Sequence, residues 1–311
     1  MKTLALLLCF TALAAAPTAA ADGFVQGAAQ LGVGVLSPDG ALRYVAAPAG
    51  SNTTLLAIRT KDGLVAGSAD IIGSYGIPVL TFNAQTDEGL SHDGRTLVVG
   101  DTQQLAESHF LVYDTRSFRM TDGIVLKGTF GFDALSPDAS RLYLIQRPAA
   151  TDYQHYVVRA YDLRTHRLLP GRIADRTQKS WVMQGSAMTR TTSADGRWVY
   201  TLYYNPGGYP FIHALDTVRG VAHCVGLPAT ASEQNGLGNV VLALHGKRLA
   251  VHWRSGRPWL NVDLASWRVT PAGHGGFPWL WLALGLGLAA AVLLLLRRIV
   301  LPKGTLSARA A

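Results

Sequence analysis

The sequence has 311 residues, of which 49% are apolar and 15% charged, with a formal net charge of +8. Soluble domains carry about 25% charged residues, and disordered chains are polar, so this composition excludes an intrinsically disordered polymer. Only two cysteines are present, which excludes a small fold held by disulfides and a cysteine-rich zinc module.

Residues 1–21 are typical of a secretory signal peptide. Lys2 precedes a run of leucine, alanine and phenylalanine, and small residues surround Ala19–Ala21. These are the charged region, the apolar region and the cleavage region of such a peptide. The apolar run is short for a membrane span, and a retained N-terminal anchor is the alternative.

A repeated motif runs through 22–276. Its copies are LSPDGALRYVA, LSHDGRTLVVG, LSPDASRLYLI, TSADGRWVYTL and the weaker LALHGKRLAVH. Their central positions are Asp39, Asp93, Asp138, Asp195 and His245, at spacings of 54, 45, 57 and 50 residues. In a Pro-Asp-Gly turn the carboxylate accepts a backbone hydrogen bond and glycine supplies a positive φ. We therefore interpret these aspartates as structural repeat corners and not as a carboxylate cluster.

A second element follows four of the corners at a similar distance. It contains Asp114, Asp162, Asp216 and Asp263. Around both elements lie short alternating or apolar runs of strand length. Four such strands in about 50 residues fit one blade of a β-propeller. The sequence therefore predicts an all-β fold, a β-propeller of five four-stranded blades over 22–272.

Two details of this propeller stay open. Residues 64–89 are long enough to hold extra strands, so six blades are the alternative. Residues 23–35 are expected to supply the strand before the first corner. Pairing of the N-terminal and C-terminal strands in one sheet would close the ring.

The motif resembles the YVTN-type, WD40-like β-propeller repeats of exported bacterial proteins. The resemblance is carried by Ser37–Gly40 with Tyr44 and Val45, by Ser136–Asp138 with Leu142 and Tyr143, and by Asp162–Thr165 before Leu168. It covers about 36–270 of the chain. Such proteins include surface-layer-like proteins, binding scaffolds, lactonases and lyases. The resemblance therefore implies the fold and leaves the function open.

The run from Phe277 to Leu296 contains no charge in twenty residues. At 1.5 Å per residue it would extend roughly 30 Å, the thickness of the bilayer core. Two tryptophans lie at its start and basic residues follow it: Trp279, Trp281, Arg297, Arg298, Lys303 and Arg309. This pattern predicts one transmembrane helix over 277–296, with the basic tail 297–311 in the cytoplasm and the propeller outside it. A buried globular helix and proteolytic removal of the segment are the alternatives.

Charge and motifs exclude several functions. The two ends hold five of the 28 Lys and Arg residues and none of the 20 acids, so the part between them has a net charge of about +3. Nucleic-acid binding requires a denser basic surface. No nucleophile elbow, zinc-protease motif, P-loop, calcium loop or C-x-x-C pair is present. We predict no catalytic residue, metal or cofactor, and we interpret Cys224 as a small apolar core residue.

Two segments interrupt the repeat and are the candidate binding sites. The first is an aromatic loop, 203–211, and its proposed contact residues are Tyr203, Tyr204, Asn205, Tyr209 and Phe211. Loops on a rigid scaffold carry recognition, and tyrosine suits binding because its large face loses little entropy. The alternative is a hairpin loop that packs on its own sheet.

The second segment, 172–190, is basic. It contains Arg176, Lys179, Trp181 and Arg190. It could form a rim that binds an anionic ligand or lipid headgroups, and a solvated loop is the alternative.

These observations predict a single-pass cell-membrane protein whose propeller is a non-catalytic binding or scaffolding module. The expected partner is an envelope or membrane protein, or a small anionic ligand. An enzyme of the lactonase-like or lyase-like type, with its site at the mouth of the central channel, is the alternative. Convergence of His, Arg and acidic side chains from different blades would favour the enzyme, because the fold alone does not decide.

Overall fold

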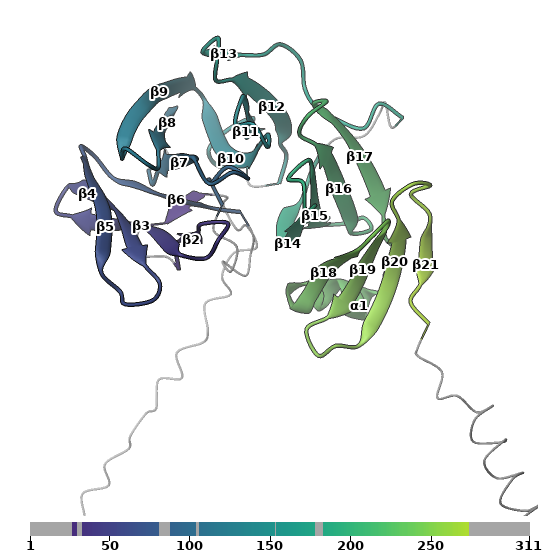
Figure 1. The fold of residues 1–311 in the computed structure, drawn as a ribbon. Coiled ribbons are helices and arrows are strands. Elements are labelled where there is room, and N and C mark those ends of the chain that lie inside the picture. Colours follow the sequence, from purple (N-terminus) through teal and green to yellow (C-terminus); the bar gives the residue numbers. More distant parts are fainter. Residues whose placement is uncertain are drawn as a thin grey trace, which may run out of the picture. The chain divides into compact units, whose positions relative to one another are not determined.

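The computed structural model describes residues 27–29, 33–80, 88–103, 106–152, 154–177 and 183–273. These residues form an all-β structure of five antiparallel sheets (Figure 1). A short helix, α1 (Ala231–Asn235), and a 3-10 turn, η1 (Leu237–Asn239), precede the last sheet. The predicted all-β class and the five repeats are therefore confirmed.

Each repeat of the sequence forms one sheet. The first is β2 (Val35–Leu36), β3 (Leu42–Ala49), β4 (Asn52–Arg59) and β5 (Val65–Ile71). The second is β1 (Gly27–Ala29), β6 (Tyr75–Val79), β7 (Thr96–Asp101), β8 (Glu107–Asp114) and β9 (Arg119–Lys127). The third is β10 (Thr129–Leu135), β11 (Arg141–Arg147), β12 (Val157–Asp162) and β13 (Arg167–Leu168). The fourth is β14 (Ser186–Thr192), β15 (Trp198–Tyr204), β16 (Phe211–Asp216) and β17 (Val221–Gly226). The fifth is β18 (Val240–His245), β19 (Arg248–Trp253), β20 (Pro258–Asp263) and β21 (Val269–Pro271).

The chain divides into two compact units between Gly238 and Asn239. The first unit holds four sheets and the second holds the fifth. The long segment 64–89 contains no additional sheet in its described part, because β5 completes the first sheet and β6 begins the second.

The N-terminal strand pairs differently from the expected ring closure. β1 pairs with β6, with Gly27 opposite Val79 and Ala29 opposite Ile77, and it becomes the fifth strand of the second sheet. All four strands of the fifth sheet come from the C-terminal part of the chain. Within the described residues, pairing of the terminal strands was therefore a wrong prediction. The strand before the first corner is the two-residue β2, which begins at Val35, the last residue of the segment 23–35 expected to supply it.

The corners between the first and second strands share one hydrogen-bond pattern. A serine hydroxyl donates to the corner aspartate over 2.5–2.7 Å and accepts the N–H five residues after itself over 2.8–3.0 Å. The residue after the aspartate has a positive φ of 51–71°, in Gly40, Gly94, Ala139 and Gly196. Ala139 adopts this conformation without being glycine. The aspartates therefore hold the turns closed.

The hairpins between the third and fourth strands repeat a second pattern. Their aspartates accept backbone N–H groups two or three residues further on over 2.7–3.2 Å: Asp114, Asp162, Asp216 and Asp263. The residue after each aspartate donates its N–H to a carbonyl of the corner of the same sheet. We call these hairpins the Asp turns. These bonds tie the Asp turn to the corner beside it, at one end of the sheet.

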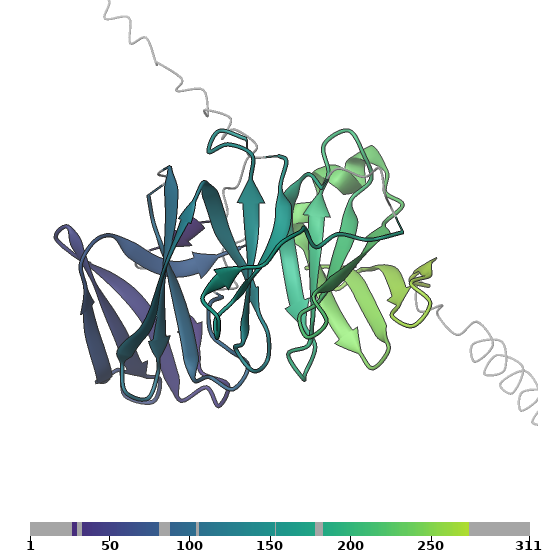
Figure 2. The same cartoon turned by 90° about the horizontal axis from the view of Figure 1, so that it is seen from above.

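The core of the first unit lies between successive sheets. Leu97 and Val99 of β7 pack with Leu55 of the first sheet, whereas Val98 packs with Leu142 of the third. Side chains of β11 alternate likewise, because Tyr143 packs towards the fourth sheet. Alternate residues of a strand face opposite sides of its sheet, so both faces of the second and third sheets are buried. Figure 2 shows these sheets following one another in chain order. This is the packing of propeller blades.

The predicted signal peptide and the segment 277–296 lie outside the described residues. Among the described residues no helix is long and apolar enough to cross a membrane.

Candidate functional site

The loop between β15 and β16, residues 205–210, is held in shape by one side chain. The Asn205 amide nitrogen donates to the Tyr209 carbonyl over 3.3 Å, and the Gly208 N–H donates to the Asn205 carbonyl over 3.1 Å. A Cβ at Gly208 would lie 2.3 Å from the Asn205 amide nitrogen. Leu227 N–H donates to the Pro210 carbonyl over 2.7 Å. The loop is thus fixed at both ends before any partner binds.

A buried aromatic stack supports this loop. Tyr203 and Phe211 are paired residues of β15 and β16, and their parallel rings lie 5.2 Å apart. Tyr156 stacks on Tyr203 at 5.3 Å. All three side chains are buried. Stacked rings at this spacing contribute packing energy beyond their buried area, so the base of the loop is rigid.

Two further segments lie against the loop. The Gln184 amide donates to Asn205 Oδ1 over 2.8 Å. His155 forms an isolated bridge with Gln184 and also lies 3.0 Å from the Asp152 carboxylate. The structure therefore brings together the two segments that interrupt the repeat. We call residues 152–156 (except 153), 183–185 and 205–210 the loop face.

Only part of the predicted aromatic site is available to a partner. Tyr209 is 65% exposed and Tyr204 is half-buried. Tyr203, Asn205 and Phe211 are buried, so the prediction that they contact a partner directly was wrong. The reason is that β15 continues to Tyr204 and β16 starts at Phe211. Tyr203 and Phe211 therefore belong to the strands and turn into the core.

The basic segment is divided in the structure. Arg176 is exposed, and Lys179 and Trp181 lie outside the described residues. Arg190 is in β14, and only 2% of its side chain is exposed. Its guanidinium donates to the Asp133 carboxylate over 2.5 Å and to the Asp133 carbonyl, and its Nε donates to Thr201 over 2.9 Å. Arg190 is therefore a core residue and not part of a basic rim.

The Arg190 cluster joins three sheets. Asp133 is in β10, Arg190 is in β14, and Glu88 precedes the corner of the second sheet, with its carboxylate 3.8 Å from Arg190. The Asp133 carboxylate is as buried as the guanidinium. Arginine and acidic side chains from different sheets meet here, whereas the mark set for an enzyme site also required a histidine and a place at the mouth of the channel. The buried pair is internally compensated, which fits a structural role.

A second polar cluster lies beside the aromatic stack. His213 Nδ1 is 3.4 Å from the Cys224 sulfur. Burial lowers the pKa of His213 to about 4 and raises the pKa of the Cys224 thiol to about 12. Both groups are therefore neutral near pH 7, which agrees with the interpretation of Cys224 as a core residue. Asp175 accepts the Cys224 N–H over 2.8 Å and lies 3.0 Å from His223, so it fixes the 172–177 segment to β17.

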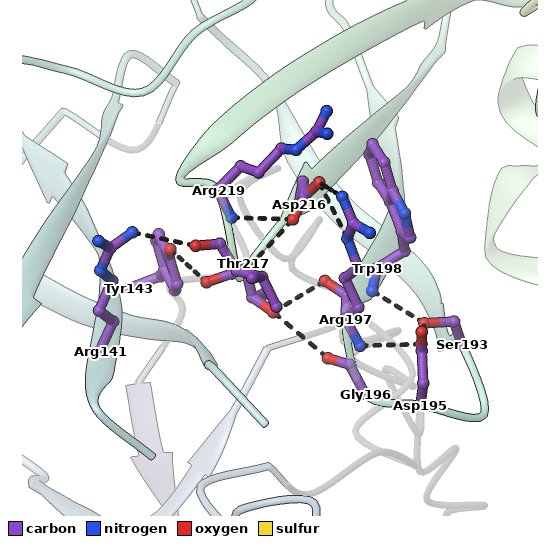
Figure 3. A network of polar contacts seen from close by, with 11 residues as sticks. Arg141, Tyr143, Ser193, Asp195, Gly196, Arg197, Trp198, Asp216, Thr217 and Arg219 are labelled. Carbon is purple, nitrogen blue, oxygen red and sulfur yellow. Dashed lines mark hydrogen bonds and ion pairs between the residues drawn. The ribbon is translucent and has the colours of Figure 1, made fainter. Parts of the chain in front are cut away.

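A network of hydrogen bonds joins the third and fourth sheets (Figure 3). Tyr143 donates its hydroxyl to the Thr217 carbonyl over 2.6 Å, and Arg141 donates to the Val218 carbonyl over 3.2 Å. Arg197 binds the Asp216 carboxylate over 2.6 Å. In the described part of the chain, no group of three His, Cys, Asp or Glu side chains is arranged to hold a metal ion.

Sequence reasoning missed Asp133 and Glu88. A signal was present for Asp133, because it is the one charged residue in the strand TFGFDAL. A lone acid in an apolar strand needs a buried cation as a partner. No comparable pattern marks Glu88.

Comparison with known proteins gives weak similarities. No family model and no curated protein matches the chain. Among solved structures it is similar to the β-propeller domain of Cps50 (Swd1) from Myceliophteria thermophila, with 10% identity and a TM-score of 0.44 over 73% of this chain and 65% of that one. It is also similar to TolB from Acinetobacter baumannii, with 13% identity and a TM-score of 0.41 over 72% and 51%. It is similar as well to Sqt1 from Saccharomyces cerevisiae, with 12% identity and a TM-score of 0.44 over 76% of this chain and 61% of that one. The chain thus spans less than two thirds of each of these proteins, and its architecture is assigned from its own strand order.

Proposed function

We propose that this protein is a propeller-type binding module, exported from the cytoplasm and tethered to the membrane by residues 277–296. In this proposal the loop face holds a protein of the cell envelope. The observation that carries it is the fixed 205–210 loop, which presents Tyr209 above a buried aromatic stack. A loop that is ordered before binding loses little entropy on binding, and exposed tyrosines are frequent anchors of protein interfaces.

The chemistry of the loop face favours a protein over a small anionic ligand. The loop that carries Tyr209 is joined through Asn205 to the Gln184 amide, and His155, which pairs with Asp152, forms a bridge with Gln184. An aromatic residue with a polar surround is the usual composition of a protein interface. The buried, compensated Arg190 is not available for an anion.

The test uses photo-crosslinking of the full-length protein in its native membrane. A photoreactive phenylalanine analogue at position 209 is expected to capture one envelope protein, and the same analogue at Met120 is expected to capture none. Met120 is the matched control because it is 56% exposed and lies in β9 of another sheet. Loss of an anchor tyrosine costs about 1–2 kcal/mol, so Tyr209→Ala should lower recovery in affinity capture about tenfold. Equal capture from both positions, or unchanged recovery, would contradict the proposed face.

The tether has its own test. A chain that stops after Ala272 is expected to be released from the membrane fraction, whereas the full-length chain stays in it. Retention of the shortened chain on membranes would contradict the tether and leave the loop face untouched.

A further inference from the structure

Equivalent spaces recur between neighbouring sheets of the first unit. Each lies between the second strand of one sheet and the Asp turn of the next sheet. The corner pattern sets the equivalence: Leu42 in β3 and Arg141 in β11 both follow their corner serines by five residues and bond to them. Tyr44 and Tyr143 therefore correspond, and so do the Asp turns that they face.

The space between the third and fourth sheets is closed. Arg141 and Tyr143 of β11 reach across it and donate to the carbonyls of Val218 and Thr217 (Figure 3). The turn carbonyls are thus satisfied by a guanidinium and a phenol. Between the second and third sheets the corresponding turn residue is Leu163, which packs against the apolar core around Val98.

The space between the first and second sheets is open. It forms a pocket with a volume of about 780 Å³. Pockets of 300–1,000 Å³ are typical of ligand sites. Leu42 replaces arginine here, and the hydroxyl of Tyr44 makes no hydrogen bond to any described residue. Small residues widen the pocket from β4 and β5: Ala57, Ala66, Gly67 and Ser68.

The turn carbonyls in this pocket lack the donors that their counterparts have. Thr115 and Arg116 correspond to Thr217 and Val218, and both line the pocket. Among the described residues no group donates to either carbonyl oxygen. A ligand that supplies N–H donors at this point would complete the pattern of the other pair of sheets.

We propose that this pocket binds the guanidinium group of an arginine side chain presented by a partner polypeptide. The guanidinium would occupy the place that corresponds to that of Arg141 between the third and fourth sheets. It would donate to the Thr115 and Arg116 carbonyls. A planar fork of five donors suits two adjacent carbonyls better than a single ammonium does.

The remaining lining supports a cation with an apolar stem. The rings of Tyr44 and Phe118, 6.2 Å apart, line the pocket, and aromatic faces attract guanidinium groups. Asp39 uses only Oδ1 in its corner, and its hydrogen bond from Ser37 lowers its pKa, so it stays ionised. Two cations also line the pocket, and each has an acid beside it. Arg95 lies 3.7 Å from Asp93, and the charge of Arg116 helps to lower the pKa of the neighbouring Asp114 carboxyl.

The test is a ligand-observed NMR titration of the full-length protein in detergent with Nα-acetylarginine N-methylamide. We expect saturable binding with a dissociation constant on the order of 1 mM. The citrulline analogue has nearly the same shape but lacks the charge and two of the five N–H donors of the guanidinium. It should therefore bind at least about tenfold more weakly. Equal binding of the two probes, or no binding of the arginine probe at about 10 mM, would overturn the proposal.

Two variants place the binding in this pocket. Leu42→Arg should close it with the chain's own guanidinium and abolish binding, whereas Leu42→Met should keep binding. If Leu42→Arg fails to fold, Ala66→Trp blocks the pocket from its exposed edge, with Ala66→Ser as its control. Undiminished binding by a folded blocking variant would also overturn the proposal. The loop face is untouched by these changes, so capture through Tyr209 should persist in every variant.

Discussion

Replacement of Arg190 by methionine is expected to destabilise the protein by about 4 kcal/mol, because it leaves the Asp133 carboxylate buried without a counter-charge. Both side chains are 2% exposed, so water cannot replace the lost partner. Removal of one member of a buried ion pair costs roughly 3–5 kcal/mol. The methionine has a similar length and fills most of the space, so a cavity adds little.

The bonds of Arg190 account for this size. Its guanidinium bonds the Asp133 carboxylate, the Asp133 carbonyl and the Thr201 hydroxyl. Each buried group that loses its partner costs about 1–3 kcal/mol, and some regain bonds by relaxation. The Glu88 carboxylate, which lies 3.8 Å from the Arg190 guanidinium in the native protein, would then oppose Asp133 with a like charge and no cation between them. A value near the middle of the range is therefore expected.

The assay is urea unfolding of the full-length protein followed by circular dichroism. Arg190→Met should lower the free energy of unfolding by about 4 kcal/mol at pH 7. The matched control is Arg190→Met with Asp133→Leu, which removes both charges and should recover most of the stability. A loss below about 1 kcal/mol for the single variant, or no recovery in the double variant, would refute the buried-pair reasoning.

Three further predictions concern two buried side chains and a corner of the first unit. The pKa of His213 is about 4 in the folded protein and 6.5 when unfolded. His213 should therefore contribute about 3 kcal/mol of stability that is complete above pH 6.5 and is lost as the pH falls towards 4. The variant His213→Phe should remove this part of the pH profile of urea unfolding. Cys224, with its buried thiol pKa of about 12, should react with a thiol reagent at least about a hundredfold faster in urea than in the native protein; equal rates would contradict its burial. Gly196→Ala places a Cβ 2.8 Å from the His92 ring and should cost about 2–3 kcal/mol in urea unfolding. Gly40→Ala, at a corner with nothing within 4 Å, should cost only the backbone strain of about 1 kcal/mol. Equal losses would contradict the contact between Gly196 and His92.

The repeat was predictable because its determinants are local. Each corner needs a serine, an aspartate and a residue with positive φ within four positions, and each forms its bonds inside that segment. The spacing of such segments then gives the number of sheets. The pairing of β1 with β6 was not predictable in this way, because Gly27–Ala29 carry no pattern that selects one strand edge over another.

The candidate site was predicted in part. The 203–211 segment does contain a loop with an exposed tyrosine, but the alternation of β15 and β16 decides which aromatic residues turn inwards. Arg190 looked like a surface residue because a basic segment precedes it in the sequence. Its partner, Asp133, is 57 residues away, and only the packing of β14 beside β10 brings the two charges together.

The Asp turns show how a repeated scaffold accommodates different contacts. The fourth residue after each aspartate has a positive φ of 53–69°, in Phe118, His166, Gly220 and Trp267. A side chain in this conformation costs roughly 1–2 kcal/mol, so glycine would be the least strained choice in all four turns. Two of these residues contact the sheet before their own. Phe118 lies against Gly67 of the first sheet, and His166 lies 2.9 Å from Asp122 of the second sheet. These contacts between sheets offset the strain.

At Gly220 the contact between sheets comes from the preceding sheet and not from the turn residue. A Cβ there would meet the side chains of Arg141 and Tyr143, which already join the third and fourth sheets through the turn carbonyls. Where the preceding sheet supplies the bridging side chains, the turn ends in glycine; where it does not, as at Leu42, the turn ends in Phe118. The open pocket beside Phe118 follows from this difference, because a phenyl ring has no hydrogen-bond donor to offer the turn carbonyls.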